Sequence, residues 1–83
     1  MTTLHADTTL DLIPVGERAR ISKIRGGKTL TRRLLGLGLR IGSEISVLQH
    51  RGRGVVVASA GNRVALGGSV ANKLLMSPVT TQS

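Results

Sequence analysis

The chain contains no cysteine, tryptophan, tyrosine or phenylalanine among its 83 residues. Without cysteine it can form neither a disulfide framework nor a thiolate metal site. Without aromatic side chains it lacks the stacking platforms that hold single-stranded nucleic acid, so phosphate contacts are all that remain for that function. Its core must be built from leucine, isoleucine, valine, alanine and methionine. A chain of this length has room for one small domain.

Acidic residues are nearly as scarce, with four against 12 lysines and arginines, for a formal net charge of +8. Asp7, Asp11 and Glu17 precede every basic residue, so Glu44 is the only acid after Arg18. Such a surface attracts anions, and we expect nucleic acid, an acidic lipid surface or an acidic protein face as its partner. So few carboxylates cannot be paired convincingly as acid and base, and we predict no catalytic residues and no enzyme activity.

Long apolar runs are also missing. No stretch approaches the roughly 20 apolar residues of a membrane-spanning helix. The opening segment, rich in threonine, lacks the charged and then apolar pattern of a signal peptide, so we expect a cytoplasmic protein. Residues 1–9 and 80–83 have no apolar period and are predicted to be disordered, which leaves a domain over residues 10–79.

One segment, KTLTRRLLGLGLRIG from Lys28 to Gly42, combines a helical apolar period with start and stop signals. Thr29 is the expected N-cap, and Gly36 or Gly38 the expected stop. A helix of two to three turns is too short to be stable alone, so its leucine face must be docked on the remaining segments. That face comprises Leu30, Leu34 and Leu37, with Leu35 beside them, and we expect Leu34 and Leu37 to be buried against a valine-rich strand.

The other segments predict five short strands, at residues 18–25, 43–51, 54–60, 63–66 and 74–79. The RGRG run at 51–54 and the Gly61-Asn62 pair indicate hairpin turns. RGRG could also cradle an anion, but the helix start that follows a P-loop is absent. Ser69 is the expected N-cap of one helical turn over residues 70–73. Five strands with one short helix predict an all-β, small SH3-like five-stranded antiparallel barrel.

Two runs, RRLLGLGLRIGSEISV and GVVVASAGNRVALGGSVANKLLM, resemble the bacterial ferrous iron transport protein A family. The resemblance covers roughly Leu12 to Val79. It departs from the family pattern at Gly36, where a charged helix former is common, and at Ile41, where proline is common. The matching positions are Arg33, Leu34, Leu35, Leu37, Gly38, Leu39 and Gly42 in the first run, and Ala65, Leu66, Gly67, Ala71 and Lys73 in the second.

The resemblance implies a non-enzymatic accessory protein that binds the cytoplasmic side of a membrane ferrous iron transporter with a GTPase domain. It also implies a likeness to the C-terminal module of iron-dependent repressors. We predict that the partner binds the helix and its following turn, where apolar side chains are rimmed by arginines. The predicted contact residues are Arg32, Arg33, Leu37, Leu39, Arg40 and Ile41.

Two other functions stay open, and no cofactor is expected for any of them. One is a stand-alone regulatory domain like the repressor module. The other is a nucleic-acid-binding barrel that uses Arg18, Arg20, Lys23, Arg25, Arg51 and Arg53.

A ferrous site ordinarily needs two histidines and a carboxylate. His5 and His50 are the only imidazoles, and we expect both to be ordinary solvated residues and the protein to have no metal site.

Overall fold

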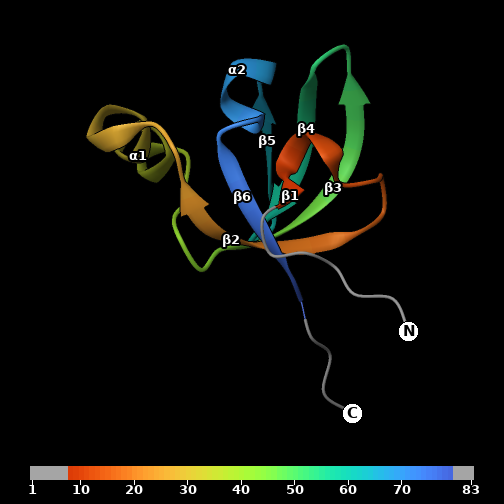
Figure 1. Cartoon of the computed structure of the whole chain (residues 1–83). Helices are drawn as coiled ribbons and strands as arrows, with labels where there is room; N and C mark the ends of the chain where they lie inside the picture. The colour runs from red at the N-terminus through yellow and green to blue at the C-terminus, as the bar shows by residue number, and fades with distance from the viewer. Residues whose placement is uncertain (1–7, 80–83) are drawn as a thin grey trace.

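A computed structural model describes residues 8–79 (Figure 1). It is a mostly-β structure with one short helix of more than a single turn, as the sequence predicts. Its six strands lie in one antiparallel sheet, in the order β1-β6-β2-β3-β4-β5. No helix within the described range is long and apolar enough to cross a bilayer. The elements are β1 (Thr8–Thr9), η1 (Leu10–Leu12), β2 (Arg18–Ile24), α1 (Gly27–Gly36), β3 (Glu44–Arg51), β4 (Gly54–Ser59), β5 (Asn62–Leu66), α2 (Gly68–Ala71) and β6 (Leu74–Pro78).

The sixth strand, β1, lies where the sequence predicts a disordered segment. Thr8 pairs with Met76 and Thr9 with Leu75, so these two residues form a strand although they were predicted to be disordered. Two threonines show no apolar period, and only the edge of β6 makes them a strand. The rest of the predicted disordered termini, residues 1–7 and 80–83, lies outside the described residues.

The short helix η1 joins the two halves of the sheet. It contacts β4, β6 and α2, and Leu10 at its start is fully buried. Ile13 follows it into the core, whereas Leu12 stays exposed. Segment 10–13 therefore fills the space that the bent sheet leaves open. The apolar pattern of the sequence does not indicate this role.

Helix α1 begins and ends at glycines. Gly26 holds the N-cap position, where a side chain would lie 2.5 Å from Cδ2 of Leu30, and Thr29 lies inside the first turn. The prediction of Thr29 as the cap is therefore wrong. At the other end, the Gly38 N–H donates to Leu35 O at 2.9 Å and the Leu39 N–H to Leu34 O at 2.8 Å. With φ +84° at Gly38, these bonds form a Schellman motif, and Gly38 is the stop.

This helix end decides which leucines are buried. Leu34 and Leu39 are 1% and 0% exposed, because a Schellman motif folds the residue after its glycine back onto the last helical turn. Leu37 lies outside that contact and is 48% exposed. The expected burial of Leu37 and the expected exposure of Leu39 are both wrong, because helical spacing no longer applies once the chain leaves the helix.

The core lies between the inner faces of the sheet. In β4, Val55 and Val57 are buried while Val56 is half-buried, so the valine run alternates as a bent strand with one better-covered face. Irregularities in β2 between Ile21 and Lys23, and in β3 between Val47 and Gln49, mark the bends. This curvature lets a small sheet wrap around one aliphatic core.

The β4–β5 hairpin turns one residue earlier than predicted. Ser59 pairs with Asn62, so the turn is Ala60-Gly61, with φ of +50° and +85°. Positive φ at both residues is the requirement of a type I′ turn, which matches the twist of the flanking strands. The helical turn before β6 also differs, because Gly67 occupies the N-cap position predicted for Ser69.

Candidate functional site

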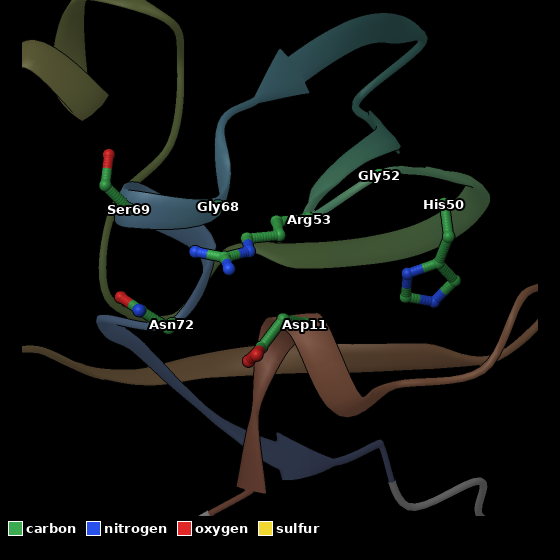
Figure 2. A pocket seen from close by; sticks show the side chains of 7 residues that line it. All are labelled: Asp11, His50, Gly52, Arg53, Gly68, Ser69 and Asn72. Atoms are coloured by element: carbon green, nitrogen blue, oxygen red, sulfur yellow. The ribbon is translucent and has the colours of Figure 1, made fainter.

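A polar hollow lies between η1, the β3–β4 turn and α2 (Figure 2). It has a volume of about 490 Å³. Two of its polar side chains, those of His50 and Asp11, already have partners within the fold. Nε2 of His50 donates to the Ile13 carbonyl at 2.7 Å, and the Thr9 hydroxyl donates to Oδ1 of Asp11. The lining residues are Asp11, His50, Gly52, Arg53, Gly68, Ser69 and Asn72.

Metal-binding groups do not gather in this hollow. Nowhere in residues 8–79 do three or more His, Asp or Glu side chains come together as possible ligands. His50 uses one ring nitrogen on a backbone carbonyl, and His5 lies outside the described residues. The expectation of no metal site stays a prediction, and no set of possible ligands among the described residues contradicts it.

The glycines beside the hollow serve close packing. A Cβ on Gly68 would lie 2.5 Å from Cβ of Arg53, and a Cβ on Gly54 would lie 2.8 Å from the Leu66 carbonyl. Gly52 has a φ of +58° and forms the β3–β4 turn with Arg53. The RGRG run is therefore a hairpin turn, as expected. Its Gly54 allows the close approach to β5, and Gly68 allows α2 to approach Arg53.

The outer face of α1 has a different character. Lys28, Arg32 and Leu35 follow each other at helical spacing, on the side away from the buried Leu30 and Leu34. They border a groove of about 350 Å³ with Gly27 and Thr31. Leu35 is 53% exposed there.

Leu35 also borders a second groove, of about 560 Å³, which runs between the connector after α1 and the β4–β5 turn. Arg40 and Ser43 lie on its connector side, and Ser59 and Ala60 on its turn side. Leu35 thus links Arg32 on the helix with Arg40 on the connector. We call this set the Leu35 surface, comprising Lys28, Arg32, Leu35 and Arg40.

The connector that carries Arg40 is tied to β2 and to itself. The Gly42 N–H donates to Ile21 O at 2.8 Å, and the Ile21 N–H donates to Ser43 O at 2.9 Å. The Arg40 N–H donates to Oγ of Ser43 at 3.0 Å, and the Ser43 N–H to Arg40 O at 2.9 Å. Ile41 follows Arg40 with 58% of its side chain exposed.

The structure divides the six predicted contact residues. Arg32 and Arg40 lie on the Leu35 surface, and Ile41 is exposed next to Arg40. Arg33 and Leu37 line another groove, which faces β5 and α2. Leu39 is buried and cannot touch a partner, so its assignment is wrong.

Sequence reasoning also missed Leu35 as an exposed residue and a candidate for contact, because it grouped Leu35 with the core leucines. The signal was present in the spacing. Adjacent helical residues point about 100° apart, so Leu35 cannot share the face of Leu34. It falls instead one turn after Arg32, on the solvent side.

All 12 lysines and arginines lie in the described range and are exposed. Glu44 pairs with Arg18 at 3.0 Å and approaches Arg20 at 3.8 Å, while the other ten have no ion pair within residues 8–79. The six residues of the nucleic-acid alternative do not form one patch. Lys23 and Arg25 lie at one end of the β2–β3 ribbon, and Arg51 and Arg53 lie at its other end.

Comparisons with a family model and with a relative point to the same family. The FeoA domain family model matches residues 8–78. A Methanocaldococcus jannaschii protein named Fe(2+) transport protein A is 30% identical over 61 residues, which are 74% of this chain and 74% of that protein.

Solved structures show the same fold. The crystal structure of an iron uptake regulatory protein (FeoA) has a TM-score of 0.78 at 25% identity, over 84% of this chain and 95% of that one. The FeoA protein of Chlorobium tepidum has a TM-score of 0.78 at 22% identity, over 92% and 74% of the two chains. A manganese-dependent transcriptional repressor has a TM-score of 0.80 at 21% identity, over 87% of this chain and 36% of that one. The last two identities show a shared fold alone.

Proposed function

The chain belongs to the FeoA domain family, and we propose that it is a non-enzymatic accessory protein of Fe(2+) uptake. Its partner in this proposal is the cytoplasmic side of a membrane transporter that carries a GTPase domain. Support for the transport role comes from the 30% identical relative named for Fe(2+) transport, which matches over 74% of both chains. The protein would act from the cytoplasm, at the inner face of the membrane.

The observation that carries a docking role is the Leu35 surface. A half-exposed leucine lies between Arg32 and Arg40, neither of which has an ion pair among the described residues. Protein interfaces combine an apolar centre with a polar rim, and arginine is enriched in them. Burial of Leu35 would supply affinity, and the two cations would steer an acidic partner to it.

The experiment is Fe(2+) uptake in cells that carry the wild type, Leu35→Asp, Arg40→Glu or Arg51→Glu at matched protein level. Leu35→Asp and Arg40→Glu should lower uptake, while Arg51→Glu should leave it near the wild-type value. Arg51 is a suitable control because it is exposed, unpaired in the described chain and located at the β3–β4 turn. Arg20 is less suitable, since it lies near Glu44.

A binding assay separates this proposal from the nucleic-acid alternative. The purified GTPase domain should bind the wild type and lose affinity for Leu35→Asp. Duplex DNA of random sequence, if bound, would lose affinity by about one decade per decade of salt for each phosphate contacted. Steep DNA binding of that kind, with uptake unchanged in Leu35→Asp and Arg40→Glu, would favour the alternative and refute the transporter surface.

A further inference from the structure

Strand β5 forms one edge of the sheet, and some of its backbone N–H and C=O groups point away from the sheet. The Ala60-Gly61 turn makes Ser59 and Asn62 a hydrogen-bonded pair, and the bonding alternates along an antiparallel ladder. The N–H and C=O groups of Asn62, Val64 and Leu66 therefore face β4. Those of Arg63 and Ala65 face outward, and in residues 8–79 no backbone bond between elements reaches them. This edge has the groups that an added strand would pair with.

A narrow groove of about 60 Å³ lies beside the end of this edge. Arg33 and Leu37 border it from the α1 side, and Leu66 and Val70 border it from the other side. Leu37 is half-exposed here and has no place in the core. Because side chains of a strand alternate between two faces, a strand added along β5 would point every second side chain toward the inner face where this groove lies.

Charge selects the kind of strand that fits. Arg63 projects from the outer face of β5, and Arg33 lies across the groove; both are exposed and lack an ion pair in the described chain. A second copy of the protein would bring another net charge of +8 to this edge. Like charges repel across paired strands, so an acidic segment fits better than self-association.

We propose that the β5 edge binds an extended acidic segment of a partner protein by strand addition. The segment pairs its backbone with Arg63 and Ala65 and places a carboxylate opposite Arg63. Three positions away, on the opposite face, it places a small apolar side chain opposite Leu66, in the groove with Leu37. This surface is separate from the Leu35 surface and goes beyond the function proposed above.

The test starts from selection of a displayed random peptide library on the intact protein. Enriched peptides should carry Asp or Glu with a small apolar residue three positions away. On binding, the amides of Arg63 and Ala65 should become protected from hydrogen exchange. Arg63→Glu should weaken the selected peptide by about tenfold or more, whereas Arg32→Glu, on the outer face of α1, should leave its affinity unchanged.

Two changes test the backbone pairing directly. Ala65→Pro removes an N–H that faces outward, and proline is tolerated on edge strands at such positions. It should abolish peptide binding while leaving the β4 ladder in place. The second change is in the peptide: N-methylation of the residue whose N–H meets the Ala65 carbonyl should weaken binding to the unaltered protein, which keeps the test valid if Ala65→Pro does not fold.

Three results would each overturn the proposal. The first is the absence of any enriched peptide. The second is that Arg63→Glu binds the selected peptide as tightly as the wild type does, and that the wild type binds the N-methylated peptide as tightly as the unmodified one. The third is sedimentation showing dimers that Arg63→Glu disrupts. The last would identify a second copy as the occupant. None of these results bears on the transporter proposal, which is judged by Leu35→Asp and Arg40→Glu.

Discussion

The polar hollow of Figure 2 and the Leu35 surface differ in whether a large, exposed apolar side chain lies among their residues. In the hollow, His50 and Asp11 are held by bonds to Ile13 and Thr9. On the Leu35 surface, an apolar side chain is 53% exposed between cations without ion partners in the described chain. An exposed apolar side chain rimmed by cations is a better marker of a binding surface than the volume of a polar pocket.

The two regions also use glycine differently. Beside the hollow, Gly54 and Gly68 are needed because another part of the chain lies where a Cβ would be. At the α1 end, Gly36 and Gly38 have open space around them, and Gly38 serves only through its positive φ. One region is fixed by close packing and the other by backbone conformation, so alanine at Gly68 and alanine at Gly36, which has no positive φ, should change stability in opposite directions.

The largest expected effect separates the inside of the α1 end from its surface. Leu39→Ala should lower the free energy of unfolding by about 2–5 kcal/mol, because Leu39 is fully buried and its loss leaves a cavity. Leu37→Ala should cost less than about 1 kcal/mol, since its side chain is half in water already. Urea denaturation of both variants gives the comparison. Similar losses would mean that Leu37 belongs to the core after all.

The next effect tests the contrast between the glycines. Gly68→Ala should destabilise the protein by about 1–3 kcal/mol, because its Cβ would lie 2.5 Å from Cβ of Arg53. Gly36→Ala should stabilise it by about 0.5–1 kcal/mol, because alanine favours the helix and nothing lies within 4 Å of the new Cβ. Thermal unfolding measures both. If the two variants shifted stability in the same direction, the contrast would fail.

A smaller effect concerns the hollow itself. His50→Ala should cost about 0.5–1.5 kcal/mol, the usual contribution of one hydrogen bond, because it removes the donor to the Ile13 carbonyl. Anaerobic Fe(2+) binding, measured by calorimetry, should stay at background for both the wild type and the variant. A stoichiometric isotherm that is lost in His50→Ala would show that the hollow is a metal site.

The smallest effect lies at the rim of the Leu35 surface. Ala60 has a φ of +50°, a conformation that costs a residue with a Cβ about 1 kcal/mol or more. Asparagine tolerates this conformation and is preferred in type I′ turns, so Ala60→Asn should stabilise the hairpin by up to about 1 kcal/mol. Its unfolding midpoint should rise, while Asn62→Ala serves as a control on the strand. A lowered midpoint for Ala60→Asn would contradict the turn assignment.

The sequence predicted the parts of this fold that depend on repeated local patterns. The five longer strands, α1 and a stop at Gly36 or Gly38 follow from periods of two and 3.6 and from glycine placement, and the structure places the stop at Gly38. It could not predict β1, because Thr8 and Thr9 become a strand only through the edge of β6. Thr29 failed as a cap for a related reason, since the helix starts earlier, after Gly26, which packs against Leu30.

The candidate site was predicted in part for similar reasons. Arg32 and Arg40 were placed correctly on an exposed surface, although the helical period indicated it only for Arg32, since Arg40 lies on the connector after α1. Leu39 was misplaced because its burial arises from the Schellman motif, in which two backbone bonds turn the chain back onto Leu34. Leu35 was missed although its spacing from Arg32 was visible. Whether a partner binds these residues stays a prediction.

The bonded connector after α1 has a consequence for how binding would proceed. Arg40 and Ile41 stand on a segment whose backbone is held to Ile21 and Ser43 by bonds of 2.8–3.0 Å. Ordering a loop on association normally costs entropy and slows complex formation. Here the segment has already lost that freedom on folding. A partner of the Leu35 surface should therefore associate at a rate set by diffusion and charge, with little entropic penalty from the protein backbone.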